Sequence, residues 1–329
     1  MKLKLALAVC LASAASAAVL GVRGEKFTID GKPAFLLGIS YYGGLASNDA
    51  NLRADLDEIK AHGFNWIRVW ATWRNAMAFD AAGNAMEPGF SRMVNLVKEC
   101  DKRGLIVDVT FSATEATRKL SEADRFAAQG KMIASTVKAL HGQRNWYLDL
   151  ANERNNPGTS HVPVAPLRQW RDAAKKAHPA LPITASHWND IPLERLGEYV
   201  DEIGVDFLSP HGDRLPDAVK NRAVLTQRYL KALRERGKAM PVHYQEPSRR
   251  DFIDSKGNKW QPSGEDLIVE MENSRQGGAA GWCFHNGDNH FSPDRKPERS
   301  FDLRGERLFP QFDAEERKFL AHVKKNYGK

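Results

Sequence analysis

Short apolar runs alternate with amphipathic stretches along most of the chain. Eight runs are apolar or β-branched nearly throughout, as expected for strands buried on both faces: Phe35–Ser40, Phe64–Trp70, Leu105–Phe111, Trp146–Ala151, Pro182–Ser186, Asp206–His211, Pro241–Gln245 and Ala279–His285. Stretches between them repeat apolar residues at three- and four-residue steps, which predicts helices with one buried face: Leu52–His62, Ser91–Arg103, Thr226–Arg236 and Phe312–Lys325. This alternation predicts an α/β fold.

Glycines support the predicted helix ends. Gly63, Gly104 and Gly237 each stand just before the next apolar run, where a glycine commonly ends a helix. Eight strand–helix units in 329 residues predict a (β/α)8 TIM barrel. An open doubly wound sheet is the alternative, but it would need a glycine-rich phosphate loop of the GxGxxG type, and none occurs. With no linker-like tract, we expect residues 18–329 to form one domain.

The N-terminal segment has the pattern of an export signal. Lys2 and Lys4 precede an apolar run, and Ala15-Ser16-Ala17 supplies an A-x-A cleavage site. We therefore expect residues 1–17 to be a signal peptide and the mature protein to be secreted or periplasmic. The run is short and rich in small residues, so no stable membrane insertion is expected. The mature chain keeps Cys100 and Cys283, which we expect to be buried thiols.

Two glutamates end strand-like runs and are the main candidates for chemistry. Glu153 ends YLDLANE and Glu246 ends PVHYQE, which places them after the fourth and seventh strands. The C-terminal strand ends of a parallel barrel ring one mouth, where active sites lie. Two carboxylates facing each other there can cleave a glycosidic bond, one as an ionised nucleophile and one as a proton donor. The alternatives are a helix-capping or surface role for Glu153 and a surface ion pair for Glu246.

The chain resembles the clan A glycoside hydrolases. GEKFTIDGKPAFLLGIS (Gly24–Ser40) resembles the short β-hairpin and first strand that open many of them. Asn152-Glu153 resembles the Asn-Glu pair ending their fourth strand, and Glu246 resembles their nucleophile. The resemblance implies a retaining hydrolase of a β-glycosidic bond, with Glu153 as acid/base, Glu246 as nucleophile and no cofactor.

Single residues extend the resemblance, and two features depart from it. The matching positions are an arginine on strand two, a tryptophan on strand eight and, for glycoside hydrolase family 5, a histidine on strand six: Arg68, Trp282 and His211. Family 5 usually has proline after the acid/base, whereas Arg154 follows here. Its third strand often ends in histidine, whereas Val107–Ser112 contains none.

Aromatic and polar side chains near the predicted mouth are candidate substrate contacts. Sugar rings present C–H faces that pack well against aromatic rings. The predicted substrate-binding set is Arg68, Trp70, Asn152, Trp188, His211, Tyr244 and Trp282. Ordinary core packing is the alternative for the aromatic members. We expect the partner to be an oligo- or polysaccharide.

The basic balance of the chain adds one hypothesis about the substrate. The net charge is +7 and the pI about 9.2. Four arginines fall at or near the predicted mouth and could pair with an anionic sugar: Arg154, Arg214, Arg249 and Arg250. A solvated basic surface is the other interpretation. Lysines and arginines are spread over the helices and no nucleic-acid module occurs, so nucleic acid is not an expected partner.

Other site classes have weaker support. The segment HNGDNH offers His285, Asp288 and His290 as metal ligands, but all three lie in one loop, so no metal site is expected. No GxSxG motif marks a serine hydrolase. Two further hypotheses stay open. One is a carbohydrate-binding barrel without activity, and the other is a transglycosylase or polysaccharide lyase that uses the same mouth.

Overall fold

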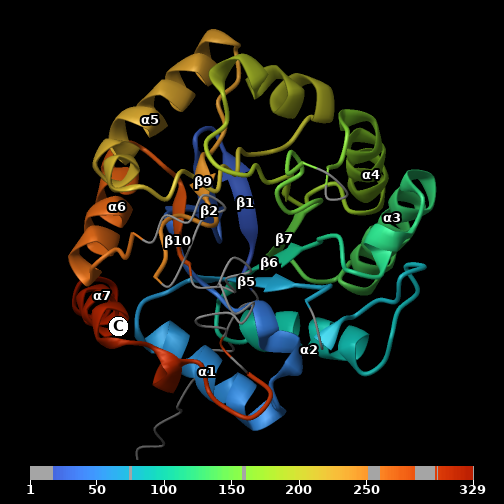
Figure 1. The fold of residues 1–329 in the computed structure, drawn as a ribbon, viewed down its shortest axis with the longest axis horizontal. Helices are drawn as coiled ribbons and strands as arrows, with labels where there is room; N and C mark the ends of the chain where they lie inside the picture. The colour runs from blue at the N-terminus through green and yellow to red at the C-terminus, as the bar shows by residue number, and fades with distance from the viewer. Residues whose placement is uncertain are drawn as a thin grey trace, which may run out of the picture.

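The computed structural model describes residues 18–73, 76–157, 161–250, 260–285, 301 and 303–328. The predicted signal peptide, residues 1–17, lies outside them. A parallel seven-stranded sheet curls through the centre of the molecule (Figure 1). In chain order its strands are β4 (Leu36–Ser40), β5 (Trp66–Trp70), β6 (Ile106–Thr110), β7 (Trp146–Asp149), β8 (Ile183–Thr184), β9 (His243–Tyr244) and β10 (Gly281–Phe284). They pair in the order β8-β7-β6-β5-β4-β10-β9.

In the described ranges, seven α-helices surround the sheet in chain order (Figure 1). Asn48 caps the first by accepting the Asn51 N–H, and Gly63 follows it with a positive φ of 95°. Gly104 and Gly237 also have positive φ, as their predicted roles require. The helices are α1 (Asp49–Ala61), α2 (Gly89–Asp101), α3 (Glu122–Ala139), α4 (Val164–Ala177), α5 (Pro216–Glu235), α6 (Gly264–Gln276) and α7 (Ala314–Tyr327).

The predicted strand Asp206–His211 is irregular, yet it lies between the two edge strands of the sheet. Parallel bridges join Leu208 to Val242 and Pro210 to His187. Proline has no N–H to donate, which helps explain why no regular ladder continues through this segment. A short π-helical segment, η6 (Glu198–Ile203), precedes it in place of a longer helix.

The N-terminal residues form a three-stranded antiparallel sheet that includes the predicted hairpin. Its strands are β1 (Leu20–Arg23), β2 (Lys26–Ile29) and β3 (Lys32–Ala34). Asp30 and Gly31 form the turn of the hairpin with φ of 53° and 75°. The sequence did not predict β1. Phe27 packs edge-on against Phe207, with ring centroids 4.9 Å apart, in a cluster that includes β4–β7 residues. The curled sheet and the segment 206–211 between its edge strands together form a ring of strands. The small N-terminal sheet therefore covers one end of this ring.

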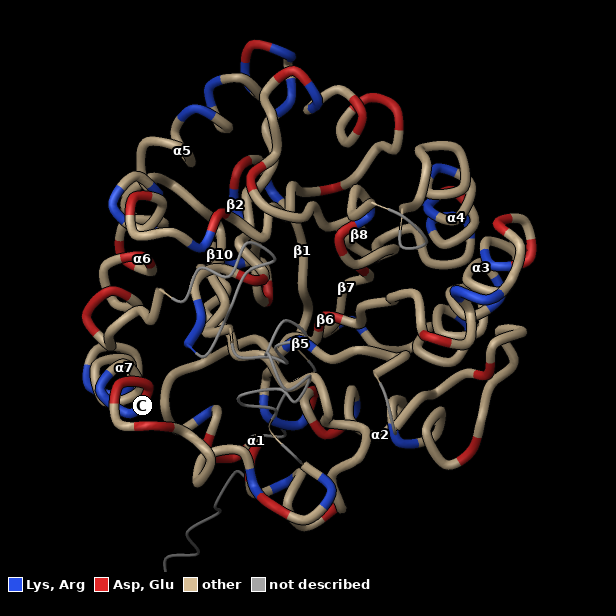
Figure 2. The backbone as a smooth tube through the Cα atoms, in the orientation of Figure 1, with Lys and Arg blue, Asp and Glu red and all other residues tan. Residues whose placement is uncertain are grey.

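The outer surface is mixed in charge. Figure 2 shows basic and acidic segments interspersed along the surrounding helices. Cys100 and Cys283 are buried free thiols, as expected. Within the described ranges, no helix combines the length and apolar character that crossing a bilayer requires.

Candidate active site

Glu246 lies just beyond β9, where the chain bends out of the regular strand. The bend interrupts the alternation of side chains, so Gln245 and Glu246 both turn into the ring. Gln245 Nε2 donates to Asp108 Oδ2 at 2.8 Å. Arg68 Nη1 donates to Glu246 Oε1, and Arg214 Nη2 donates to Oε2 at 3.0 Å. Glu246 is only 6% exposed, so its carboxylate is buried among cationic donors.

Two imidazoles complete the surroundings of the Glu246 carboxylate. His211 Nδ1 lies 3.5 Å and His285 Nε2 lies 3.4 Å from Oε2. Burial alone would raise the pKa of Glu246. The two imidazoles together with Arg68 and Arg214 outweigh burial and hold this pKa well below its usual value. Glu246 is therefore ionised at neutral pH.

Glu153 follows β7 and has a left-handed backbone, with φ of 49°. A residue with a Cβ is strained there by about 1–2 kcal/mol. Its backbone N–H donates to Ser186 Oγ at 3.0 Å. His211 Nδ1 lies 2.9 Å from Oε1, and Asn156 Nδ2 donates to Oε2 at 3.0 Å. The strained backbone and these contacts direct the carboxylate toward the centre of the mouth.

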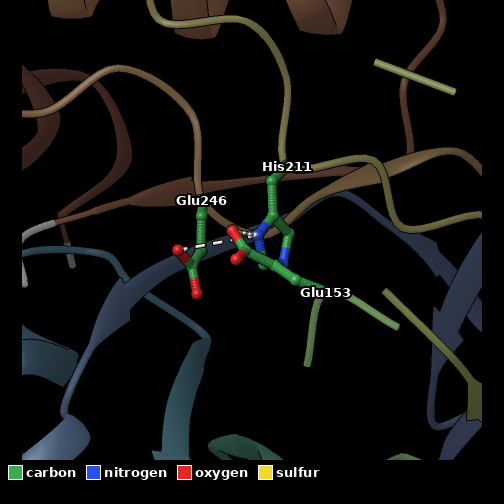
Figure 3. A group of neighbouring side chains, drawn as sticks. All are labelled: Glu153, His211 and Glu246. Carbon is green, nitrogen blue, oxygen red and sulfur yellow. Dashed lines mark hydrogen bonds and ion pairs between the residues drawn. The ribbon is translucent and has the colours of Figure 1, made fainter. Parts of the chain in front are cut away.

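Glu153 and Glu246 face each other with the His211 ring beside both (Figure 3). One oxygen of each carboxylate and one His211 nitrogen all lie within 4.8 Å of one another. Retaining glycosidases place their carboxyl groups about 5–5.5 Å apart, whereas inverting enzymes need about 6.5–9.5 Å. The three side chains also have the spacing of metal ligands. However, Arg68 and Arg214 already bind the Glu246 oxygens, and their charges oppose a cation.

Arg68 connects Glu246 to the rest of the ring. It is fully buried on β5. Nε donates to Asp108 Oδ2 at 3.0 Å, and Nη2 donates to Asp149 Oδ2 at 3.2 Å and to Asn152 Oδ1 at 2.8 Å. Sequence reasoning missed both aspartates. An acidic residue inside an apolar strand was the available signal, because a buried carboxylate needs a partner.

Aromatic side chains lie beside residues that contact or flank the two glutamates. Tyr42 stacks on Trp73 with centroids 5.2 Å apart, and Trp70 meets Trp73 edge-on at 4.8 Å. Trp188 is 38% exposed, and its backbone N–H donates to Asn155 Oδ1 at 2.7 Å. Trp188 thus offers an open aromatic face beside Asn155, two residues after Glu153.

Two predicted substrate contacts are wrong. Trp282 is fully buried and packs on Phe319 of α7, with ring centroids 5.4 Å apart. The Tyr244 hydroxyl lies 2.9 Å from Thr226 Oγ1 in α5. Both side chains face the helices, because neighbouring residues on a strand point to opposite sides. On β10 this alternation brings His285, not Trp282, to the mouth.

Two of the four arginines expected at the mouth make ion pairs elsewhere. Arg154 is buried and pairs with Glu198 at 2.5 Å. Arg250 pairs with Asp313 at 2.5 Å and also donates to a backbone carbonyl. Arg214 instead contacts Glu246. Proximity in sequence to Glu153 or Glu246 was therefore a poor guide to which arginines reach the site.

Comparison with known proteins identifies the class. Residues 23–191, just over half of the chain, match the family described as Cellulase (glycosyl hydrolase family 5). No curated protein matches by sequence. Similar solved structures include a family 5 mannosidase from Rhizomucor miehei in complex with mannosyl-fructose (13% identity, TM-score 0.62, 94% of this chain and 99% of that chain). An endo-1,4-beta-mannanase from Rhizomucor miehei has 12% identity and a TM-score of 0.63, over 93% and 98% of the two chains.

A third similar structure is an exo-beta-1,4-mannosidase from Opitutaceae bacterium strain TAV5. It has 16% identity and a TM-score of 0.64, over 93% of this chain and 62% of that chain. At these identities the likeness shows the fold. The family match goes further: the chain is a glycoside hydrolase. It belongs to glycosyl hydrolase family 5.

Proposed function

We propose that this protein hydrolyses a β-glycosidic bond in an oligo- or polysaccharide with retention of anomeric configuration. The observation that carries the proposal is the approach of Glu153 and Glu246 oxygens to within 4.8 Å. That approach suits a direct attack by one carboxylate better than attack by an intervening water. We also propose that the ring is a (β/α)8 barrel, with residues 206–211 as its sixth strand.

In the first step, a Glu246 oxygen forms a bond to the anomeric carbon. The glycosidic bond breaks, and Glu153 gives its proton to the departing oxygen. In the second step, water gives a proton to Glu153 and its oxygen attacks the anomeric carbon, which breaks the ester to Glu246. Arg68 donates a hydrogen bond to Asn152 Oδ1. This contact orients the amide so that its NH2 group can donate to a sugar hydroxyl.

Substitution of the two glutamates tests these roles. Glu246→Gln should lose several decades of kcat while remaining folded, because volume is conserved and the nucleophile is gone. Glu153→Ala should regain activity on aryl glycosides with activated leaving groups, or with added azide. Near-wild-type hydrolysis by Glu246→Gln would contradict the assignment. An equal deficit of Glu153→Ala on activated and natural substrates would show that Glu153 is not the acid.

Stereochemistry and product analysis separate the alternatives. NMR of the first-formed product should show the anomeric configuration of the substrate, whereas an inverted product would refute the two-step mechanism. Binding without turnover on a broad glycan panel would favour a carbohydrate-binding protein. An unsaturated product would reveal elimination, and a lengthened product would reveal transglycosylation. Because three similar structures are described as mannosidases or a mannanase, the panel should begin with β-mannans.

An anionic substrate is a further part of the proposal. Arg214 contacts Glu246, and Arg249 is buried with both glutamates and Arg214 among its electrostatic neighbours. Burial and Arg214 lower the pKa of Arg249 to about 10, so it remains cationic at neutral pH. We expect Arg249→Ala to raise KM for acidic glycans more than for neutral ones. Equal effects on both would leave a neutral-sugar hydrolase.

Export is the last part of the proposal. Lys2, Lys4 and the Ala15-Ser16-Ala17 site support removal of residues 1–17. Expression of the full chain in a bacterial host and N-terminal sequencing of the exported product should give a mature start near Ala18. A product that keeps Met1 and stays inside the cell would contradict export.

A further inference from the structure

His285 directly follows β10, and each of its ring nitrogens faces a buried polar group. Asp288 and His290, the other members of its predicted metal motif, lie outside the described residues. Nδ1 is 2.8 Å from the Tyr42 hydroxyl and 3.1 Å from Ser40 Oγ. Nε2 is 3.4 Å from Glu246 Oε2. The ring is only 1% exposed, so it bridges a buried hydroxyl pair and the carboxylate.

The surroundings determine where the imidazole carries its hydrogen. Burial and the nearby Glu246 raise the pKa of Tyr42 well above its usual value, so its hydroxyl keeps its hydrogen. Burial lowers the pKa of His285 well below its usual value, so the ring is neutral and has one N–H. We assign the Tyr42 hydroxyl as the donor to Nδ1, which leaves the hydrogen on Nε2. That hydrogen faces Glu246.

We propose that His285 is a positioning residue for the nucleophile, in which the Tyr42 hydroxyl fixes an imidazole tautomer that presents its Nε2 hydrogen to Glu246 Oε2. The inference rests on the proposed function of Glu246. Arg68 holds the other carboxylate oxygen. His285 thus helps define the plane of the carboxylate at its second oxygen. A contact of 3.4 Å is long for a hydrogen bond, and such contacts commonly shorten when substrate binds.

Other charged and titratable groups also act on Glu246. They come from β5, from the segment after β8, from the loop after β7, from η1 (Tyr42–Ala46) and from the loop of Glu246 itself. They are Arg68, His211, Arg214, Glu153, Tyr42 and Arg249. A role limited to packing would leave the ionisation of Glu246 untouched, and this gives the discriminating measurement.

The measurement is a carboxyl NMR titration of the full protein labelled with [5-13C]glutamate. The Glu246 signal is identified by its absence from Glu246→Gln. His285→Ala should raise the pKa of Glu246 by about 1 unit, because one donor to the charged form is lost. His285→Gln should restore most of the wild-type value, because its amide can donate from nearly the same place. An unchanged pKa in His285→Ala would overturn the inference.

Tyr42→Phe provides a second route if His285→Ala does not fold. Without the tyrosine hydrogen, the imidazole can carry its hydrogen on Nδ1 toward Ser40, so the Glu246 pKa should rise here too. Tyr244→Phe is the matched control, since this buried tyrosine also loses one hydroxyl contact but faces α5. Equal pKa shifts in the two tyrosine variants would refute the relay.

Kinetics provide an independent reading. The acidic limb of the kcat/KM profile should move upward in His285→Ala and Tyr42→Phe, and kcat should fall about 10-fold, a modest effect for a positioning residue. Full activity of Glu246→Gln would instead remove the proposed function. The NMR titration would still decide whether His285 controls the carboxylate, so the two failures are distinguishable.

Discussion

Replacing Arg68 with lysine would measure how far the active site depends on one buried side chain. Arg68 donates through three nitrogens to Asp108, Asp149, Asn152 and Glu246. A lysine has its donors at a single point and cannot span positions that the planar guanidinium reaches together. At least two of the charged contacts should therefore be lost in Arg68→Lys.

The size of the effect follows from burial. A hydrogen bond to a charged group contributes about 1.5–3 kcal/mol, and breaking a buried ion pair costs about 3–5 kcal/mol. Arg68 and its acidic partners Asp108 and Asp149 are fully buried, so solvent screens these contacts little. We expect the free energy of unfolding to fall by about 3–5 kcal/mol. Because one donor to the reacting carboxylate also goes, kcat/KM should fall by about 10²–10³.

The pH dependence gives a further sign to test. The folded pKa of Glu246 lies below its unfolded value. Its contribution to stability is therefore full above about pH 4.3 and is lost as the pH falls through the folded pKa. Arg68→Lys should raise the folded pKa. The acidic limb of kcat/KM should then move upward, and stability should be lost at a higher pH than in the wild type.

Urea unfolding followed by tryptophan fluorescence, together with pH–rate profiles, would check both effects. Arg222→Lys is the matched control. Arg222 is also fully buried and pairs with Glu270 at 2.7 Å and Asp190 at 3.1 Å, yet these contacts are separate from Glu246. It should lose similar stability without moving the acidic limb. A wild-type acidic limb in Arg68→Lys, or the same shift in both variants, would refute the reasoning.

Burial raises the pKa of Asp108 to about 8. The free energy of unfolding should therefore decrease as the pH rises from about 4 to about 8, because Asp108 ionises in the unfolded chain before it ionises in the folded protein. Asp108→Asn should flatten this slope in urea titrations, and an unchanged slope would contradict the cause. Trp188→Ala should raise KM for oligosaccharides several-fold with little change in kcat, and an unchanged KM would exclude sugar contact. Trp282→Phe should lower stability by about 1–3 kcal/mol and leave KM unchanged, whereas a raised KM would restore Trp282 as a contact.

The alternation of elements could be predicted because each buried strand is an unbroken apolar run and several helices end at glycine. Trp66–Trp70 and Ile106–Thr110 fall within their predicted ranges. The sixth run was harder, because apolar character does not reveal the irregular pairing around Pro210. The added strand β1 has only four residues and follows the predicted signal peptide, so it gave little signal.

The site was predictable where residues follow a strand end and face inward. The structure brings Glu153, Glu246, Asn152 and Arg68 together with His211, as the sequence indicated. The sequence could not reveal that the strand bends just before Glu246, so that Gln245 and Glu246 both face the mouth. Tyr244 was therefore assigned to the wrong face. The partners of Arg68 and the contact of His285 with Tyr42 join residues far apart in sequence. A single chain gives no signal for such pairings.

The left-handed backbone at Glu153 matters for protein engineering. Replacing a left-handed residue that has a Cβ by glycine relieves a backbone strain of about 1–2 kcal/mol, so such positions attract stabilising substitutions. Selecting positions by this criterion would include Glu153, and its replacement would give a more stable protein that lacks its proposed acid. Asp30, also left-handed with φ of 53°, lies in a surface turn on the covered end of the ring and is the safer target.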